Sequence, residues 1–233
     1  MLMRGFSAPG GRLDRVGDAN DLNSAALLRN ALKHFREERM RLFERTFFMS
    51  SRTRVLDVGG SPEIWQLASV KPRLTFLNLP AALQHTKGNV NLVAGDGRML
   101  PFRDGEFDIV FSNSVIEHVG SREDQHRFAQ EAGRVGRHYW IQTPNRRFPI
   151  ELHIMLPLVH FLPKRLQGVI VHRFTVWERV VRPDEYARAF YLHHFLHELR
   201  LLDKRELKEL FPGATILVER VLGVPKSLIA VRS

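Results

Sequence analysis

The sequence predicts an α/β protein built on a doubly wound sheet, and three observations predict it. Short runs rich in β-branched and aromatic residues alternate with segments of helical composition, as in sheets that carry helices on their faces. Runs such as VLDV at residues 55–58 and FDIVF at residues 107–111 are nearly continuous in apolar residues, which is typical of parallel strands covered on both sides. The last two β-rich runs are joined so closely that they can form only an antiparallel hairpin.

The elements follow in order along the chain. Residues 1–21 contain glycines and charges without an apolar period and are expected to form a flexible arm. Residues 22–50 carry apolar residues at helical spacing, which predicts a helical cap of one or two amphipathic helices. The remainder, residues 51–233, is expected to be the main domain.

Within that domain the pattern indicates five strands, two helical segments, a further helix and the closing hairpin. The expected strands are residues 54–58, 74–79, 90–94, 107–112 and 138–142; the helical segments are 61–68, 121–135 and 203–211; the hairpin strands are 215–221 and 227–231, with residues 223–226 between them. Asp96-Gly97 and Asp104-Gly105 are hairpin-type dipeptides, so an antiparallel meander is the alternative. The helical composition between the strands favours the parallel sheet.

Composition limits the classes of function. The chain has 233 residues and no cysteine, which excludes a disulfide framework, a zinc finger and a thiolate nucleophile. Its 35 Lys and Arg against 25 Asp and Glu give a charge of +10, so anionic partners are expected. The first 20 residues lack the apolar core of a secretory signal, and the apolar stretch at 154–162 is too short to cross a bilayer. A cytoplasmic protein is predicted, with peripheral contact at the inner membrane surface left open.

A glycine turn follows the first expected strand. Asp57-Val58-Gly59-Gly60 stands where ligands bind in open α/β sheets, beyond the carboxyl end of a strand. Glycine lets backbone N–H groups approach a ligand closely, and the Asp57 carboxylate can face a cation. A tight strand-to-helix turn, with Ser61 as helix cap and Pro62 after it, explains the same residues without a ligand.

Three motifs together carry a resemblance to a known family. RVLDVGG at residues 54–60, GDGRMLPF at residues 95–102 and FDIVFSNSVIEHV at residues 107–119 resemble the core of class I S-adenosylmethionine-dependent methyltransferases, most closely the broad group called type 11. The resemblance covers about residues 52–145. It implies a mostly parallel, Rossmann-like, seven-stranded sheet with an antiparallel last strand, and S-adenosyl-L-methionine as cofactor.

The resemblance also implies roles for individual residues. It places Asp57, Gly59 and Gly60 around the methionine end of the cofactor. Asp96 would accept a hydrogen bond from the adenine amino group, while the backbone of Gly97 and Arg98 would lie along the ring. Asn113 and Ser114 would pass near the sulfonium.

Two features depart from the family pattern: the residue that ends the second strand, and a short glycine motif with Ser61 and Glu63 where further glycines often stand. An acidic residue usually ends the second strand and holds both ribose hydroxyls, whereas this sequence has Asn78. An amide has one acceptor oxygen where a carboxylate has two. This predicts weaker cofactor affinity, and it predicts that Asn78→Asp would hold or improve it. Glu63, which stands where further glycines are common, is expected to face solvent.

Few residues are candidates for catalysis. Methyl transfer is an in-line displacement in which the protein aligns the acceptor and, for an oxygen acceptor, removes a proton. His118 is the candidate base, with Glu117 setting its tautomer; a loop-bracing role is the alternative. His193 and His197 are four apart on an expected helix, but a polar helix face is favoured over a metal site, and no metal is predicted.

The predicted function is methyl transfer to an oxygen or nitrogen atom of a small or lipid- or saccharide-linked acceptor. An insertion at about residues 145–202 is expected to select that acceptor. Its apolar run at 150–162, flanked by Arg146, Arg147, Lys164 and Arg165, predicts a mouth for an amphipathic molecule, or alternatively a homodimer interface. The competing functions are an RNA methyltransferase, though nucleic acid is disfavoured by the scattered charge, and a cofactor-binding scaffold without transfer activity.

Overall fold

The structure is a computed structural model that describes residues 19–80, 90–151, 156–173 and 199–233. A seven-stranded sheet forms its centre in the order β3-β2-β1-β4-β5-β9-β8. The strands are β1 (Arg54–Val58), β2 (Arg73–Asn78), β3 (Asn91–Ala94), β4 (Phe107–Asn113), β5 (Gly136–Pro144), β8 (Thr215–Val221) and β9 (Val224–Arg232). The first five pair in parallel, and β9 runs antiparallel to both β5 and β8. The predicted doubly wound sheet with an antiparallel end is therefore confirmed.

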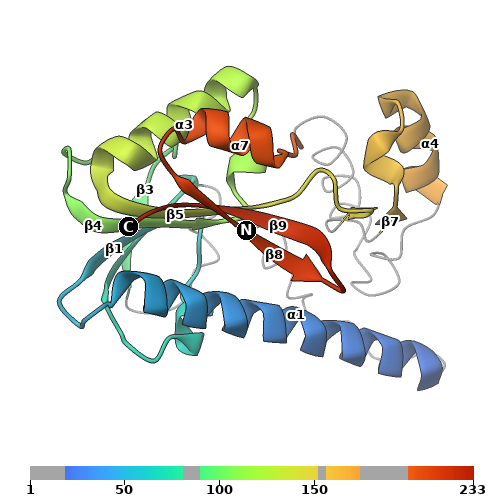
Figure 1. Cartoon of the computed structure of the whole chain (residues 1–233), viewed down its shortest axis with the longest axis horizontal. Coiled ribbons are helices and arrows are strands. Elements are labelled where there is room, and N and C mark those ends of the chain that lie inside the picture. Colours follow the sequence, from blue (N-terminus) through green and yellow to red (C-terminus); the bar gives the residue numbers. More distant parts are fainter. Residues whose placement is uncertain (1–18, 81–89, 152–155, 174–198) are drawn as a thin grey trace.

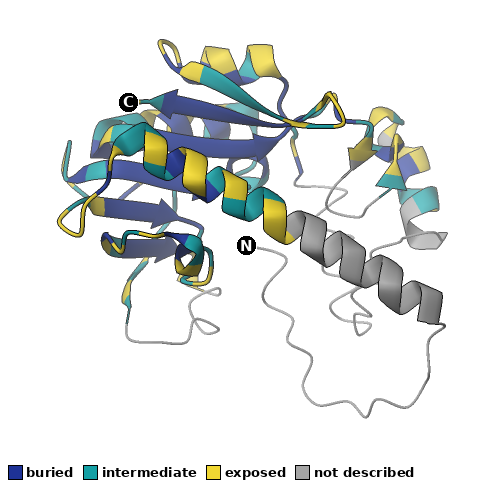
Figure 2. Cartoon of the chain, turned by 60° about the horizontal axis from the view of Figure 1, so that its bottom comes forward, coloured by how far each residue is buried: buried dark blue, intermediate teal, exposed yellow. Residues whose placement is uncertain are grey.

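Helices cover both faces of this sheet (Figure 1). The helices α3 (Arg122–Val135) and α7 (Lys204–Leu210) lie on one face, and the long helix α1 (Ala19–Phe47) crosses the other. Figure 2 shows that the strands between them are buried along most of their length. The division of the chain at residues 21 and 50 stays a prediction, because residues 1–18 lie outside the described part.

The remaining elements are short. They are the 3-10 turns η1 (Ile64–Leu67), η2 (Ile116–His118) and η3 (Val159–Phe161), the two-stranded pair β6 (Ile150–Glu151) and β7 (Leu156–Pro157), and the helix α4 (Lys164–Arg173). The segment from β6 to α4 follows the carboxyl end of β5 and projects beyond the sheet (Figure 1). It belongs to the predicted insertion, of which residues 152–155 and 174–198 lie outside the described part.

Two local expectations were wrong. The segment at 61–68 forms only the turn η1, because the Lys71 ammonium donates to the carbonyl oxygens of Trp65 and Ala68, at 2.8 and 2.7 Å, and ends it. Glu63, not Ser61, stands at its N-terminal cap position, and the Glu63 side chain makes no capping hydrogen bond. The closing hairpin turns at Leu222 and Gly223, both with positive φ, so the turn is two residues long and not the four expected at 223–226.

Each face of the sheet has its own apolar core. On the α3 and α7 side, Phe128 and Leu207 pack with Leu56, Val110 and other strand residues. On the α1 side, Met40 and Phe43 pack with Phe76, Phe111 and Trp140. The alternation of side chains along a strand sends successive residues to opposite faces, which explains the two clusters.

Phe43 is the central residue of the α1-side core. Its ring centroid lies 4.9 Å from that of Phe111, 5.5 Å from that of Trp140 and 5.8 Å from that of Trp65, and its side chain is fully buried. These edge-to-face contacts fasten α1 to the sheet.

We therefore expect Phe43→Ala to lower the free energy of unfolding by about 3–5 kcal/mol, because truncation of a buried phenylalanine loses transfer energy and leaves a cavity. Phe48→Ala, at a side chain that is 89% exposed, is the control and should change it by less than about 0.5 kcal/mol. Chemical denaturation of both variants measures the difference. Equal effects would show that α1 is not anchored through Phe43.

Candidate functional site

The parallel strands bring the predicted site residues to one edge of the sheet. β1, β2 and β4 end side by side, with Asp57 level with both Phe76 and Phe111. The chain leaves these strands at Gly59, Asn78 and Asn113. The residues that follow the strands therefore gather at the carboxyl edge, where open α/β sheets bind ligands.

The glycine turn after β1 is shaped by close packing. Gly59 has a φ of 74°, and a Cβ atom there would lie 2.5 Å from Cγ2 of Val115. A Cβ atom on Gly60 would lie 1.9 Å from Oδ2 of Asp57. Both positions thus require glycine, the first by backbone conformation and the second because it covers a carboxylate.

The Asp57 carboxylate is enclosed beneath this turn. Its side chain is fully buried, and Oδ2 accepts a hydrogen bond from the Trp65 indole nitrogen at 2.8 Å. Oδ1 has no hydrogen-bond partner among the described residues. Burial raises the pKa of Asp57 to about 7, although the Trp65 bond acts in the opposite direction.

Asn78 ends β2 and holds the glycine turn. Its Nδ2 donates to the carbonyl oxygen of Gly60 at 3.0 Å, and its buried Oδ1 has no partner in the described part of the chain. A carboxylate cannot make the first bond and would place an oxygen against the Gly60 carbonyl. The expectation that Asn78→Asp would preserve affinity therefore overlooked a donor that the sequence does not reveal.

Asp96 and Arg98 form an ion pair within the turn after β3. Two guanidinium nitrogens of Arg98 bond the Asp96 carboxylate at 2.6 and 3.0 Å, and the Arg98 backbone N–H donates to Oδ1 at 2.8 Å. These hydrogen bonds hold the pKa of Asp96 below its usual value. Gly97 is needed for packing, because a Cβ atom there would lie 2.8 Å from the Phe128 ring.

The end of β4 carries a polar pair that differs in its bonding. Both amide atoms of Asn113 are buried and lack a partner among the described residues. Ser114 has a φ of 53°, and its hydroxyl donates to Oε1 of Gln142 at 3.1 Å. Gln142 lies opposite Asn113 on β5, so β5 supports the loop that leaves β4.

Glu117 and His118 lie in η2, directly after this loop. The Glu117 side chain is fully buried. Its Oε2 accepts a hydrogen bond from the Thr143 hydroxyl at 2.9 Å, and its backbone carbonyl accepts one from the backbone N–H of Arg200 at 2.8 Å. The Nε2 atom of His118 is 4.0 Å from Oε1 of Glu117. Glu117 thus braces η2 against β5 and stands beside the His118 ring.

The sequence reasoning missed a charged cluster on the α1 side of this edge. Arg39 of α1 bonds both carboxylate oxygens of Glu219 at 2.6 and 2.7 Å and Oε1 of Gln142 at 3.1 Å. Arg39 lies on the same helical stripe as Phe35 and Phe43. A charged residue on an apolar stripe predicts a buried partner of opposite charge, and this pattern was present in the sequence.

Lys226 belongs to the same cluster. It is 6% exposed, and its ammonium lies 4.0 Å from the centroid of the Phe35 ring. Burial, reinforced by Arg39, lowers the pKa of Lys226 to about 8. The register shifts between Glu219 and Arg220, so Lys226 is the extra residue of a β-bulge, which a sequence pattern does not announce.

Of the remaining predictions, Glu63 is exposed as expected. His193 and His197 lie outside the described residues. Within the part that the structure describes, no group of three potential ligand side chains is arranged to hold a metal, and no helix is long and apolar enough to span a membrane.

Known proteins share this architecture. Residues 65–138 match the family described as Methyltransferase domain. A crystal structure from Rhodobacter sphaeroides, assigned as a zinc-dependent alcohol dehydrogenase, has a TM-score of 0.54 at 12% identity over 82% of this chain and 87% of the other. A protein assigned as an O-methyltransferase, from Nostoc punctiforme PCC 73102, has a TM-score of 0.52 at 11% identity over 96% and 64%. A S-adenosylmethionine-dependent methyltransferase from Methanosarcina mazei has a TM-score of 0.49 at 12% identity over 81% and 95%.

The class of the protein follows from the fold and the family match. The sheet order, with its antiparallel end, is that of the Rossmann-like methyltransferases, and the matched residues form a methyltransferase domain. The match over residues 65–138, together with the fold, supports a class I S-adenosylmethionine-dependent methyltransferase with S-adenosyl-L-methionine as cofactor. The match begins at residue 65, after the glycine turn, where the sequence departs from the family pattern.

The buried Asp57 should make stability depend on pH. Its pKa of about 7 lies above the value of 3.8 expected in the unfolded chain, so the folded state binds more protons between about pH 4 and 7. The free energy of unfolding should therefore fall as the pH rises through that window, by an amount on the order of a few kcal/mol.

Asp57→Asn is the variant that tests this, because a neutral amide keeps an acceptor for Trp65 without titrating. The stability of the variant relative to the wild type should rise between pH 4 and 7 in urea denaturation experiments. Asp108→Asn, at a half-buried carboxylate near the other end of the sheet, is the control. A difference that does not change with pH would mean that Asp57 is ionised in the fold.

Proposed function

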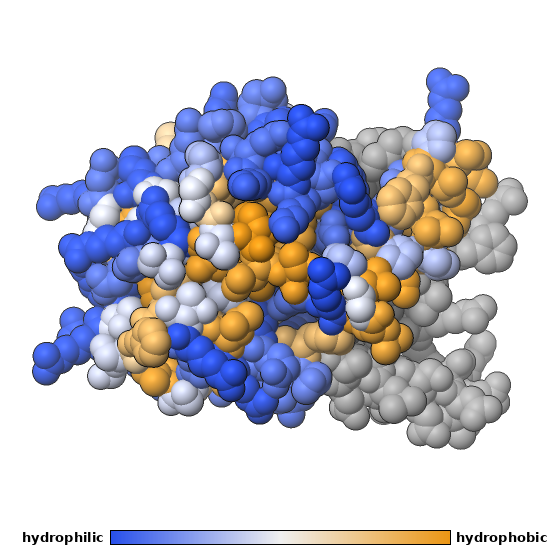
Figure 3. Space-filling view, in the orientation of Figure 1, coloured by the Kyte–Doolittle hydropathy of each residue, from blue (hydrophilic) through white to orange (hydrophobic). Residues whose placement is uncertain are grey.

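We propose that this protein transfers a methyl group to an oxygen or nitrogen atom of an amphipathic acceptor that is either a small molecule or linked to a lipid or a saccharide. The observation that carries the proposal is a set of exposed apolar side chains on the segment that follows β5. Leu158, Phe161, Leu166 and Val169 are each more than half exposed. Figure 3 shows apolar surface gathered where Figure 1 draws α4. Exposed apolar surface of this kind marks interaction sites.

The residues at the carboxyl edge fit the cofactor. Asp57, Asn78 and Asn113 each offer a buried polar atom without a partner among the described residues, and such atoms are suited to hydroxyl and ammonium groups. When bound, S-adenosyl-L-methionine supplies an electrophilic methyl group on a sulfonium.

Each candidate residue then has a proposed part. Asn78 accepts from a ribose hydroxyl through Oδ1 while its Nδ2 keeps the glycine turn in place. Asp57 balances positive charge beneath Gly59 and Gly60. Asp96 accepts from the adenine amino group in addition to Arg98, and the backbone of Gly97 and Arg98 borders the ring. Asn113 and Ser114 border the reacting methyl group.

His118 is the proposed base for an oxygen acceptor. Its side chain is 14% exposed, so the ring is largely desolvated and part of it stays accessible. Glu117, held by Thr143, is the positioning residue that orients the ring. For a nitrogen acceptor the same histidine would take the proton that the amine releases.

The proposed partner surface includes a peripheral contact with an anionic membrane. Arg165 is exposed between Phe161 and Leu166, so a positive charge accompanies the apolar side chains. Apolar anchors combined with basic side chains bind anionic bilayer surfaces. Such a contact would bring the site to lipid-linked acceptors and would keep the protein at the inner face of the membrane.

The cofactor site is tested by titration calorimetry with S-adenosylhomocysteine. The wild type should bind, and Asn78→Asp should bind about tenfold more weakly, a loss of about 1.4 kcal/mol, because the bond to the Gly60 carbonyl is broken. Asn91→Asp is the matched control: its amide donates to the Thr75 hydroxyl at 2.8 Å, which can itself donate to a carboxylate. Unchanged affinity in Asn78→Asp would show that Asn78 does not shape the cofactor site. If the wild type does not bind S-adenosylhomocysteine, the cofactor site as a whole is refuted.

The acceptor surface is tested by flotation with vesicles. The wild type should float with vesicles that contain phosphatidylglycerol more than with neutral ones, and Phe161→Ser/Leu166→Ser should lose most of that binding. Leu222→Ser removes an apolar side chain that is 99% exposed on the β8–β9 turn and should float like the wild type. A protein that binds neither kind of vesicle would contradict the membrane contact, and RNA binding that weakens steeply with salt would favour an RNA acceptor.

A further inference from the structure

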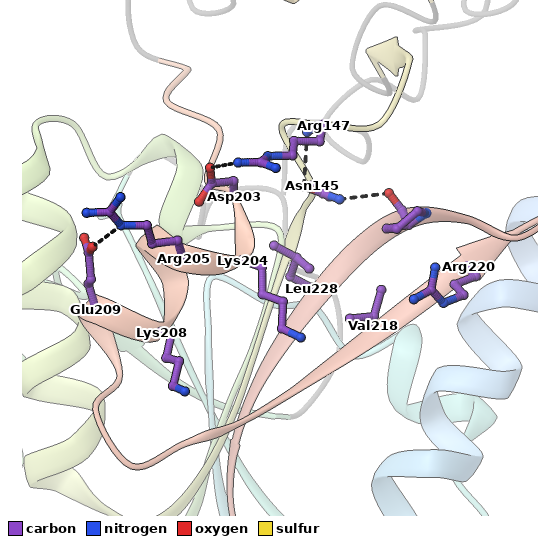
Figure 4. A pocket seen from close by; sticks show the side chains of 11 residues that line it. Asn145, Arg147, Asp203, Lys204, Arg205, Lys208, Glu209, Val218, Arg220 and Leu228 are labelled. Atoms are coloured by element: carbon purple, nitrogen blue, oxygen red, sulfur yellow. Dashed lines mark hydrogen bonds and ion pairs between the residues drawn. The ribbon is translucent and has the colours of Figure 1, made fainter.

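A hollow lies on the opposite side of the β8–β9 hairpin from α1. Its volume is about 600 Å³, within the usual range for small-molecule sites. Figure 4 shows side chains from α7, from the end of β5 and from both hairpin strands around it. The residues that line it are Asn145, Arg147, Asp203, Lys204, Arg205, Lys208, Glu209, Val218, Arg220, Pro225 and Leu228.

The hollow is apolar at its base and basic around its rim. Val218 and Leu228 pack on the α3 and α7 side of the sheet and form the base together with Pro225. Alternation along β8 sends Glu219 to Arg39 on the α1 side and leaves Arg220 on the same side as Val218. Figure 3 shows an apolar area bordered by hydrophilic side chains in the middle of this face.

The acidic side chains of the lining are already neutralised. Asp203 caps α7 and accepts from Arg146 and Arg147 at 3.0 and 3.2 Å. Glu209 is paired with Arg205 at 2.9 Å and with Arg122 at 3.3 Å. No carboxylate of the lining is left to balance a further cation.

Three cations of the lining have no carboxylate partner among the described residues. Lys204 and Lys208 are four residues apart on α7 and stand on one helix face. Arg220 of β8 lines the same hollow, and among the described residues the hydrogen bond recorded for its guanidinium goes to the carbonyl oxygen of Gly223, at 3.0 Å. Like charges that share a hollow repel one another, and an anion placed between them removes that cost.

We propose that this hollow binds a phosphate group that is attached to an apolar body. Lys204, Lys208 and Arg220 would hold the phosphate oxygens, and the body would lie on Val218, Pro225 and Leu228. Lysine and arginine are the side chains that bind phosphate, while a carboxylate ligand would leave one of the three cations unmatched. Nucleic acid requires a basic stripe that follows its backbone, and these cations surround one concave spot.

The hollow is separate from the proposed cofactor site. β4, β5 and β9 lie between β1 and β8 in the sheet, and none of the proposed cofactor residues lines it. Asn145 nevertheless connects it to the carboxyl edge, because its Nδ2 donates to the Pro225 carbonyl at 3.0 Å. A ligand held here would therefore lie alongside the segment that leaves β5 for the insertion.

The test uses the full chain, inorganic pyrophosphate and vesicles, and needs no methyl acceptor. The variant Lys204→Gln/Lys208→Gln removes two charges at exposed positions and keeps good helix formers there. The control Arg52→Gln/Arg73→Gln removes two exposed charges at the amino edge of the sheet, so both variants have the same net charge. Circular dichroism melting should show that each is folded.

Calorimetry should show that the wild type binds pyrophosphate. The affinity should be at least tenfold weaker in Lys204→Gln/Lys208→Gln, the α7 variant, and within about twofold of the wild type in the control. Flotation with phosphatidylglycerol vesicles separates two sources of the phosphate. Pyrophosphate binding that is lost in the α7 variant indicates a free phosphorylated ligand. If only the flotation is lost in that variant, with Phe161 and Leu166 intact, the ligand is a lipid headgroup.

The proposal would be overturned if the α7 variant bound pyrophosphate and phosphatidylglycerol vesicles as the wild type does, or if the wild type bound neither. Equal weakening in the two variants would also overturn it, because it would indicate diffuse attraction by the net charge of +10. Neither result bears on binding of S-adenosylhomocysteine, so failure here is distinct from failure of the proposed function.

Discussion

The hydrogen bond from Trp65 to the enclosed carboxylate of Asp57 links the core of the protein to its site. The Trp65 ring packs against Phe43 and Phe111, so helix α1 fixes it from below the sheet. Its indole nitrogen reaches Asp57, and Gly60 covers that carboxylate. Asn78 then ties Gly60 to the end of β2. The shape of the glycine turn thus depends on aromatic packing at a distance from it.

This arrangement explains why the turn tolerates a departure from the family pattern. Further glycines are absent after Gly60, and a tryptophan five residues on supplies a hydrogen bond instead. Asn78 replaces an acidic residue, and its amide contributes a donor that a carboxylate lacks. Trp65 bonds Asp57 beneath the turn, and Asn78 bonds Gly60 within it, so both residues support the same turn.

The β8–β9 hairpin separates two sets of charges. On the α1 side, Glu219 neutralises Arg39, and the bulge turns Lys226 toward Phe35. On the α7 side, Arg220 lines the same hollow as Lys204 and Lys208, and none of the three has a carboxylate partner among the described residues. One strand therefore carries a satisfied ion pair on one face and an unsatisfied cation on the other, and the second face is the one that has room for a ligand.

The sequence by itself determined the sheet and which candidate site residues share one edge of it. Continuous apolar runs such as FDIVF and the short link before Val224 restrict the topology, because a parallel pair needs a crossover and a hairpin does not. The carboxyl ends of parallel strands must share an edge, so Asp57, Asn78, Asp96 and Asn113 could be grouped in advance. Only the tertiary structure decided how those groups are bonded. The contact of Asp57 with Trp65, the donor role of Asn78, the capture of Asp96 by Arg98 and the buried pair of Arg39 and Glu219, 180 residues apart, depend on distances and side-chain orientations that no local pattern encodes.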